Sequence, residues 1–310
     1  MNVDAGAVPA GPVPPGPVRA FLRLVVIEHS VFALPFASVA ALTAMRGLAP
    51  RGTERAPVRW GDLVLITIAM VAARTFAMAA NRVIDREIDA RNPRTAGREL
   101  VTGAVSVRTA WTGAAAALAV FLLAAGLLSP LCLALAPLAV LPLVAYPYAK
   151  RVTDLPHAVL GVAQAVAPIG AWVAVTGRWS WPAVVLGLAV GSWIGGFDLI
   201  YACQDADVDR RIGVRSVPAR FGVPTALRAS TVTHLGTLML FVWFGALVRS
   251  GPWWWVGVAM TAAVFGYEHR IVRPEDLRRV NRAFFTANGF VGIALFGFAL
   301  ADLVSRGLGR

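Results

Sequence analysis

The sequence is poor in charged residues, and those that it has are unevenly chosen. Charged residues make up 15% of its 310 residues and hydrophobic residues make up 57%, whereas a soluble domain has about 25% and 45–50%. Only 17 residues are Asp or Glu, and Lys150 is the single lysine among many arginines. This composition excludes an ordinary soluble globular domain.

Cysteine is also scarce. Cys132 and Cys203 both lie in apolar stretches, so the sequence predicts neither a disulfide framework nor a zinc site. The net charge of +12 could suggest a nucleic-acid partner, but membrane proteins concentrate Arg and Lys in their cytoplasmic loops. We therefore expect no nucleic-acid partner, and no feature of the sequence indicates an obligate protein partner.

The sequence contains many long apolar segments. Windows of 18 or more mostly apolar residues recur along the chain, which is typical of helices that cross a bilayer. Residues 1–18 hold five Pro and three Gly, which predicts a disordered tail, and residues 19–310 form a single membrane-embedded domain. We predict an all-α polytopic membrane protein with nine spans, at residues 21–45, 61–81, 107–128, 130–148, 156–176, 181–203, 224–248, 252–267 and 284–304.

Basic residues predict the orientation of these spans. With the N-terminus inside, the tail and the loops after spans two, four, six and eight hold 20 of the 29 Lys and Arg residues. The positive-inside rule favours this arrangement. The run Trp253-Trp254-Trp255 is typical of an aromatic belt at a membrane interface.

Two clusters of carboxylates share one spacing, and each directly follows an apolar run. Residues Asn81–Asp89 and Asp205–Asp209 contain six of the 17 acidic residues. Acidic groups near membrane depth are costly, and carboxylates four residues apart on a helix repel each other. A divalent cation such as Mg²⁺ would convert this repulsion into coordination and would in turn recruit phosphates. The clusters therefore indicate a site for a diphosphate at the membrane surface.

A basic, turn-rich stretch follows each cluster. These stretches are residues 91–98 and 210–218. If the two helix ends meet, they form a cavity with acidic walls and arginines at its mouth, where guanidinium groups can hold the outer oxygens of a diphosphate. The alternative is that these acids and arginines are solvated charges at loop ends.

Four motifs carry a resemblance to a known family. The stretch Asn81–Asp89 resembles the N-[DR]-x-x-D-x-x-x-D motif of the UbiA superfamily of intramembrane prenyltransferases, and Asp205–Asp209 resembles its second D-x-x-x-D. Tyr146–Arg151 is similar to the family's Y-P-x-x-K-R, and Gly196–Asp205 to the F/Y-D-x-x-Y-A-x-x-D of the quinone-pathway branch. The motifs occur in the family's order, from about residue 20 to 300.

The resemblance implies a UbiA-type bundle of nine transmembrane helices around a central cavity. It implies an enzyme that uses Mg²⁺ to transfer a polyprenyl group from a polyprenyl diphosphate to a hydroxylated aromatic acid. The acceptor is of the 4-hydroxybenzoate or dihydroxynaphthoate type, and the product is a precursor of ubiquinone or menaquinone. Among the 4-hydroxybenzoate polyprenyltransferase-like members, the motifs favour the branch that prenylates a dihydroxynaphthoate in the futalosine route to menaquinone. We expect the protein in the cytoplasmic (inner) membrane of a bacterium, with the mouth of the active site on the cytoplasmic side.

The resemblance also assigns roles to residues. It implies Tyr146 near the reacting carbon, and we assign Asp198, two turns before Asp205, either to orienting or deprotonating the acceptor or to a structural hydrogen bond. The implied metal-binding residues are Asn81, Asp85, Asp89, Asp205 and Asp209, and the implied diphosphate-binding residues are Asn81, Arg82, Lys150, Arg151 and Arg210.

Polar residues inside the first two spans have alternative partners. Arg74 lies seven residues before Asn81 and shares its face of the helix. It could bind an acceptor carboxylate, or it could pair with Asp198 or Glu28. We expect His29 to be a core histidine with satisfied hydrogen bonds.

Three other functions are compatible with parts of the sequence. A relative in specialised metabolism could move a geranyl group onto a phenol, and a UbiA-like terpene cyclase could use the diphosphate chemistry without an aromatic acceptor. A secondary transporter also has many spans and charges at midplane. Mg²⁺-dependent release of diphosphate separates the enzymes from the transporter, and a requirement for an aromatic co-substrate separates the transferase from the cyclase.

Overall fold

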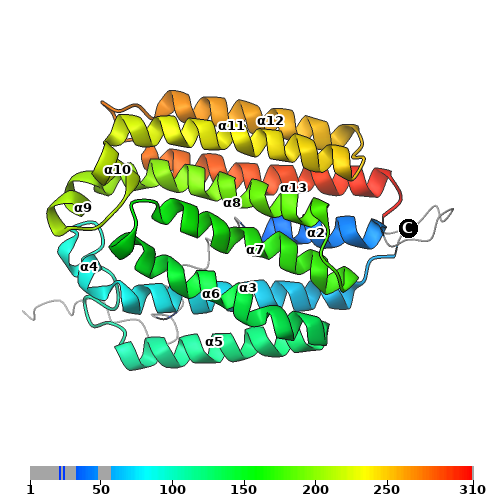
Figure 1. Ribbon diagram of the computed structural model, residues 1–310, viewed down its shortest axis with the longest axis horizontal. Helices are drawn as coiled ribbons and strands as arrows, with labels where there is room; N and C mark the ends of the chain where they lie inside the picture. The colour runs from blue at the N-terminus through cyan, green and yellow to red at the C-terminus, as the bar shows by residue number, and fades with distance from the viewer. Residues whose placement is uncertain (1–20, 22–23, 25–32, 48–56, 309–310) are drawn as a thin grey trace, which may run out of the picture.

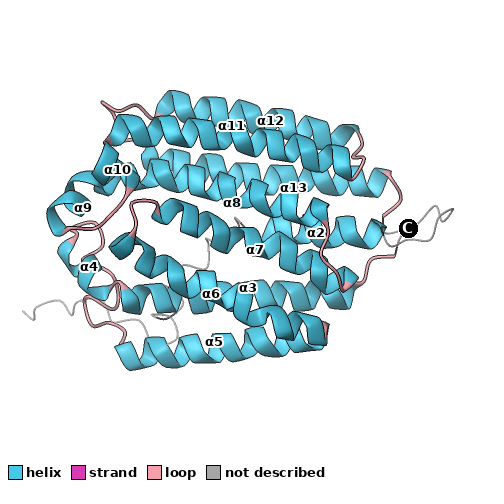
Figure 2. Ribbon diagram, in the orientation of Figure 1, coloured by secondary structure: helices cyan, strands magenta, loops and turns pink. Residues whose placement is uncertain are grey.

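The described part of the chain is built from helices alone. The computed structural model describes residues 21, 24, 33–47 and 57–308, and within these ranges there is no strand (Figure 2). The predicted tail, residues 1–18, and the residues Glu28 and His29 lie outside the described residues.

Nine helices of 14 or more residues form the bulk of the described ranges. Their bounds lie close to the predicted spans, except at the start of the first span, where most of the residues before 33 lie outside the described residues. They are α2 (Leu34–Gly47), α3 (Trp60–Ile84), α5 (Val107–Leu128), α6 (Pro130–Val152), α7 (Pro156–Thr176), α8 (Trp181–Ala202), α11 (Val223–Leu247), α12 (Pro252–Ile271) and α13 (Asn288–Ser305). The short elements are α4 (Arg86–Arg91), η2 (Cys203–Asp205), α9 (Ala206–Ile212), α10 (Val217–Phe221) and the π-helical turn η3 (Arg282–Ala287).

Seven helical segments in the described ranges are long and apolar enough to cross a membrane. They contain α3, α5, α6, α7, α8, α11 and α13. The described part of α2 has 14 residues, fewer than the roughly 20 that a span needs, and α12 is not among the seven. The protein is therefore an integral membrane protein, as predicted, while nine crossings remain a prediction.

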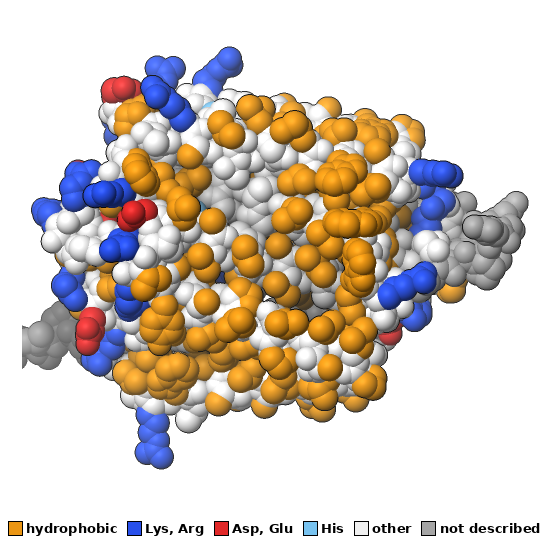
Figure 3. Space-filling view, in the orientation of Figure 1, with side chains coloured by type: hydrophobic (Ala, Val, Ile, Leu, Met, Phe, Trp, Pro, Cys, Tyr) orange, Lys and Arg blue, Asp and Glu red, His pale blue; other side chains and the backbone are white. Residues whose placement is uncertain are grey.

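The long helices run side by side along the length of the molecule, and the short helices α4, α9 and α10 lie together at one end (Figure 1). On the face shown in Figure 3, hydrophobic side chains cover the middle, and basic and acidic side chains gather at the two ends. This distribution is that of a bundle with an apolar belt in lipid and its loops in water. The end with α4, α9 and α10 carries both acidic clusters, because these helices contain or adjoin them.

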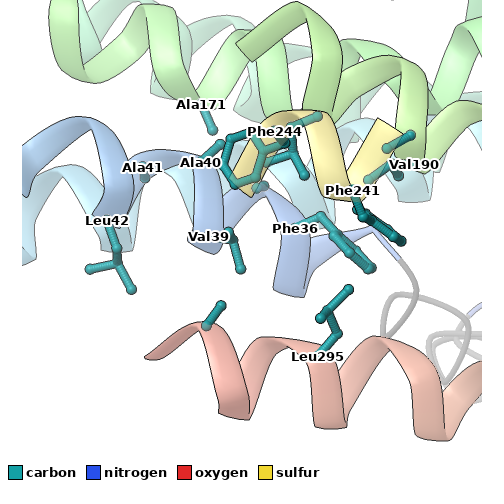
Figure 4. Packing of buried hydrophobic residues seen from close by; sticks show 14 of the residues in the cluster. Phe36, Val39, Ala40, Ala41, Leu42, Ala171, Val190, Phe241, Phe244 and Leu295 are labelled. Carbon is teal, nitrogen blue, oxygen red and sulfur yellow. The ribbon is translucent and has the colours of Figure 1, made fainter. Parts of the chain in front are cut away.

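The core of the bundle is centred on α2. Phe36 stacks on Phe241 of α11 at a centroid distance of 5.9 Å and lies 5.2 Å from the ring of Trp193 in α8, and Leu295 of α13 belongs to the same cluster (Figure 4). The expected aromatic belt is wrong in one position. Trp253 and Trp255 of the run are exposed, but Trp254 is 2% exposed and donates from Nε1 to the carbonyl oxygen of Phe241 at 3.2 Å.

A seam of glycines brings α7 and α8 into backbone contact. A Cβ atom added at Gly161 would lie 2.7 Å from the carbonyl oxygen of Gly191, and one added at Gly195 would lie 3.0 Å from that of His157. Small residues at four-residue spacing permit such an approach between helices in a membrane. The seam sets the distance between His157 on α7 and the residues near Asp198 on α8.

We expect Gly191→Val to lower the melting temperature of the protein in detergent. Its Cβ would lie 2.4 Å from the carbonyl oxygen of Gly161, and forcing a packed interface apart costs about 1–3 kcal/mol or more. Gly236→Val is the matched control, because a Cβ atom at Gly236 on α11 meets nothing within 4 Å. Equal melting temperatures for the two variants would contradict the contact.

Candidate functional site

The two acidic clusters occupy equivalent breaks in their helices. Asp85 lies between α3 and α4 with φ −93° and ψ 1°, and Asp205 is the last residue of η2, directly before α9, with φ −100° and ψ 0°. Each break starts a short helix on which the second aspartate of the motif, Asp89 or Asp209, follows one turn later. The spacing that the two acidic clusters share in the sequence therefore corresponds to a repeated local structure.

Asp85 is the most heavily paired acid of the site. Its side chain is 1% exposed, and its carboxylate forms ion pairs with Lys150 Nζ at 2.5 Å and with Arg151 Nη1 at 3.1 Å. Asn81 Nδ2 donates to the same carboxylate at 3.0 Å. Lys150 and Arg151 come from the last turn of α6, so this carboxylate joins α6 to the end of α3.

Asp89 is held by the loop that follows α4. Arg98 Nη1 donates to its carboxylate at 2.6 Å, and Thr95 Oγ1 donates to its backbone carbonyl at 2.9 Å. The carboxylate is therefore buried but charge-compensated, as a buried acid must be.

The same loop reaches across to the second cluster. Asn92 Nδ2 donates to Asp205 Oδ1 at 3.0 Å, and Arg94 donates to both carboxylate oxygens of Asp205, from Nε at 2.9 Å and from Nη2 at 2.5 Å. Arg94 Nη1 also donates to the hydroxyl of Tyr201 at 2.9 Å. Burial lowers the pKa of the Arg94 guanidinium, but its hydrogen bond to Asp205 and the nearby charges of Asp205 and Asp89, together with Tyr201, outweigh this effect and raise the pKa above its usual value. The loop thus joins clusters that lie more than 100 residues apart.

Asp209 completes the group from the other side. It is nearly buried and accepts a hydrogen bond from Ser216 Oγ at 3.1 Å. Asp205 and Lys150 both act on it electrostatically, so Lys150 lies within range of both motifs. Glu87 and Asp207, the middle acids of the two clusters, are exposed and point away from this group, as expected for residues two positions from the paired aspartates on a helix.

A second polar group lies deeper between α3, α6 and α8. The hydroxyl of Tyr146 is acted on electrostatically by Asp198, Asp85 and Arg74, among others. Asp198 does not pair with Arg74 in the structure. Its carboxylate lies 2.7 Å from Nδ1 of His157 instead. The predicted alternative of an Arg74–Asp198 pair is therefore wrong.

Arg74 borders an apolar cavity of about 380 Å³ between α2, α3, α5, α6 and α7. The Nε atom of Arg74 is buried without a hydrogen-bond partner in the described part of the chain. The other polar lining residues are Gln164 and Cys132, and the rest of the lining is apolar, including Met70, Phe121, Leu135, Ala139, Leu143, Val166 and Ile169. The space suits an apolar chain or ring with one polar substituent near Arg74.

The donor set of the two motifs suits a hard divalent cation. Carboxylate and amide oxygens are the ligands that Mg²⁺ prefers, and five such side chains lie in the two motifs. Within the described ranges no three acidic, His or Cys side chains are gathered closely enough to form a metal site as they stand. Asp85, Asp89 and Asp205 are each paired with Lys or Arg instead. A cation that bound these carboxylates would therefore replace the basic side chains as their partner. Those Lys and Arg side chains could then bind an anionic ligand.

The remaining predicted basic residues differ in their placement. Arg82 lies among the charges of Arg98, Asp89 and Asp85, at the group of aspartates. Arg210 forms a pair with the exposed Asp207 at 3.1 Å, and its own side chain is 58% exposed. It therefore faces outward in the structure, in contrast to its predicted role at the diphosphate.

Sequence reasoning missed four residues of this region. Asn92, Arg94 and Arg98 lie in the basic stretch that was expected at the mouth, but no spacing rule identifies which of its members reach the aspartates. The fourth is His157, which follows Pro156 at the start of α7, and no pattern in the sequence links it to Asp198.

Known proteins resemble this chain along most of its length. The model of the UbiA prenyltransferase family matches residues 33–290. The 4-hydroxybenzoate octaprenyltransferase of Chromohalobacter salexigens is 31% identical, over 91% of this chain and 92% of that protein. The 4-hydroxybenzoate solanesyltransferase of Synechocystis sp. is 33% identical, over 80% of this chain and 84% of that protein.

Solved structures show the same fold. A UbiA homolog from Aeropyrum pernix K1 superposes with a TM-score of 0.79 at 36% identity, covering 89% of this chain and 98% of that one. A UbiA homolog from Archaeoglobus fulgidus, solved with GPP and Mg²⁺ bound, superposes with a TM-score of 0.68 at 20% identity, covering 92% of this chain and 99% of that one.

Proposed function

The chain belongs to the UbiA prenyltransferase family, and from this premise we propose that it transfers a polyprenyl group from a polyprenyl diphosphate to a ring carbon of a hydroxylated aromatic acid, with Mg²⁺ as cofactor, in the biosynthesis of a respiratory quinone. The observation that carries the proposal is the joining of the two aspartate motifs by Asn92 and Arg94, with Lys150 in range of both. This arrangement concentrates hard oxygen ligands and exchangeable cations at one end of the bundle.

In this proposal the aspartate motifs hold the metal, and the basic side chains hold the diphosphate. When bound, Mg²⁺ supplies a Lewis acid that neutralises the charge of the leaving diphosphate. The proposed metal-binding residues are Asn81, Asp85, Asp89, Asp205 and Asp209. Once the metal binds their carboxylates, Lys150, Arg151, Arg94 and Arg98 are free to donate to phosphate oxygens, together with Arg82; guanidinium groups suit these oxygens because they donate in pairs.

The deeper polar group serves the aromatic acid. Tyr146 on α6 and Asp198 on α8 lie deeper in the bundle than the aspartate motifs, and in this proposal the ring meets the first carbon of the prenyl group beside them. The apolar cavity accommodates apolar parts of the substrates, and Arg74 at its wall offers a carboxylate an Nε that has no partner among the described residues. Its relatives act on 4-hydroxybenzoate by their names, which supports that acid as the acceptor and ubiquinone-type synthesis over the menaquinone branch.

We place the enzyme in the bacterial cytoplasmic membrane with the site facing the cytoplasm. Lys150, Arg94 and Arg98 all lie at the aspartate end, and positive charge favours the cytoplasmic side. Residues 19–310 form its one domain in this proposal.

We expect Arg74→Gln to raise the KM for the aromatic acid at least about 10-fold while leaving the KM for the prenyl diphosphate unchanged. Loss of a hydrogen-bonded charge pair costs about 1.5–3 kcal/mol, which corresponds to this range. Steady-state kinetics with each substrate varied in turn measures both constants. Decarboxylated acceptors such as phenol should show the same KM with both proteins, and a larger KM for the diphosphate instead would place Arg74 on the donor side.

A membrane assay tests the proposed reaction. Membranes containing the protein are incubated with radiolabelled geranyl or octaprenyl diphosphate, Mg²⁺ and a panel of hydroxybenzoates and hydroxynaphthoates. We expect a labelled aromatic product that requires both the acid and Mg²⁺. Labelled hydrocarbon or alcohol formed equally with and without an acid would indicate a cyclase or a hydrolase and would overturn the proposal.

A further inference from the structure

A histidine and an aspartate form an isolated pair below the metal-binding motifs. Nδ1 of His157 lies 2.7 Å from Oδ2 of Asp198, and the side chains are 6% and 17% exposed. Asp198 precedes Asp205 by two helical turns, or about 10 Å along α8. The pair is therefore separate from the aspartates proposed to bind metal.

The partner of Nδ1 determines what the other ring nitrogen can do. When Asp198 is ionised and the His157 ring is neutral, Nδ1 donates to the carboxylate, which can only accept, and Nε2 carries a free lone pair. This Nε2 atom is buried and has no hydrogen-bond partner among the described residues. Buried polar atoms normally have a partner, so Nε2 is an oriented proton acceptor for a group that the described residues do not supply.

The surroundings of the pair point to the aromatic substrate. The electrostatic influence of Asp198 extends to the hydroxyl of Tyr146, and that hydroxyl is also within range of Arg74 and Asp85. The pair thus lies in the same interior region as the residue proposed to bind the acceptor carboxylate. The glycine seam between α7 and α8 holds the backbones of His157 and Gly195 close, so the pair is fixed by two rigid helices.

We propose that His157 accepts the hydroxyl proton of the aromatic acid and that Asp198 orients it; this inference rests on the proposed function. A neutral imidazole held by a carboxylate is a suitable general base near neutral pH. Removal of the hydroxyl proton raises the electron density of the aromatic ring of the acceptor when the prenyl group reaches it.

The step breaks one carbon–oxygen bond and forms one carbon–carbon bond. The bond between C1 of the prenyl group and the diphosphate oxygen breaks, and its electron pair leaves with the diphosphate. The ring carbon next to the hydroxyl forms the new bond to C1 while the hydroxyl proton moves to Nε2 of His157. The resulting dienone regains its aromatic ring when the hydrogen on the newly bonded carbon moves as a proton to the oxygen. His157 then releases its proton to water.

Two substitutions distinguish a role of His157 as a proton acceptor from a role in which it only holds α7 and α8 together. His157→Asn places an amide N–H near the position of Nδ1, so it can keep the bond to Asp198 while it removes Nε2. Asp198→Asn keeps the imidazole but no longer requires Nδ1 to donate. His157→Gln retains more of the side-chain volume, should His157→Asn fold poorly. His269→Asn is the matched control, because His269 bonds to His234 and Thr231 on α11 instead.

The decisive readout is the acidity of the acceptor. The purified protein with Mg²⁺ is assayed with 4-hydroxybenzoate and with its more acidic 2-fluoro and 3-fluoro derivatives. We expect His157→Asn and Asp198→Asn to lower kcat with 4-hydroxybenzoate about 100-fold or more, with the KM for the prenyl diphosphate unchanged. The loss relative to wild type should shrink as the hydroxyl becomes more acidic, because such a group ionises with less help from a base.

The outcomes are distinct from those for the proposed function. Equal losses with all three acceptors, together with a lower melting temperature than that of His269→Asn, would overturn the base and leave a structural tie. Wild-type turnover in His157→Asn would overturn it as well. A wild-type protein that forms no prenylated aromatic acid would overturn the proposed function, and this inference with it.

Discussion

Replacing any one of Asp85, Asp89, Asp205 and Asp209 by Ala should lower product formation at least about 100-fold, the range seen when one charge-stabilising group is removed from an active site. Each carboxylate belongs to a group that reaches across two motifs, so a metal that loses one of them no longer neutralises the leaving diphosphate. The measurement is the rate of labelled aromatic product at saturating Mg²⁺.

Neighbouring acids provide matched controls for these four substitutions. Glu87 and Asp207 lie in the same two clusters but are exposed, so Glu87→Ala and Asp207→Ala should retain wild-type rates. Asp85→Asn serves beside Asp85→Ala, because Lys150 and Arg151 would otherwise face an empty position. Wild-type turnover in two of the four aspartate variants, in protein that elutes and melts as wild type does, would contradict the assignment.

Lys150→Ala should raise the KM for the prenyl diphosphate about 10-fold or more, the equivalent of one charged hydrogen bond. Lys150 is the single lysine of the chain and bonds to Asp85 in the structure. We expect it to move to a phosphate oxygen when a metal binds this carboxylate. The KM for the aromatic acid should stay unchanged, since the donor alone carries phosphate.

Lys150→Arg is the companion variant. It keeps the positive charge but replaces a compact ammonium by a planar guanidinium, so its KM should fall between those of the wild type and Lys150→Ala. An unchanged KM for the diphosphate in Lys150→Ala, with a lower melting temperature, would show that the lysine serves only to neutralise Asp85.

Much of the fold could be predicted because a membrane leaves few alternatives. Lipid requires every backbone polar group to be bonded within its own segment, so each apolar run predicts a helix, and the observed helices follow those runs. The spacing of the aspartates also predicts which acids share a face, and the exposed Glu87 and Asp207 agree with it. Local periodicity carried both of these predictions.

Contacts between distant segments could not be read from the same patterns. Arg94 and Asn92 bond to Asp205 across more than 100 residues, and several arginines of that loop were equally plausible. Pairing with Arg74 was one of the alternatives for Asp198, which lies instead beside His157, because the glycine seam places α7 against α8. Trp254 resembles its exposed neighbours in sequence, but its position on α12 directs it to Phe241. These outcomes depend on helix packing, which no single segment encodes.

The joint clamp for metal and diphosphate is tested most directly by equilibrium binding. A non-reactive prenyl thiodiphosphate can be titrated into the purified protein with Mg²⁺ or with EDTA, using isothermal calorimetry, for the wild type, Asp85→Ala, Asp205→Ala and Asp207→Ala. We predict that Mg²⁺ tightens binding of the analogue at least about 10-fold in the wild type and in Asp207→Ala, and that this coupling, equal in both directions, disappears when either Asp85 or Asp205 is replaced. Binding of the analogue that is equally tight in EDTA, or Mg²⁺ coupling that survives both substitutions, would contradict the clamp.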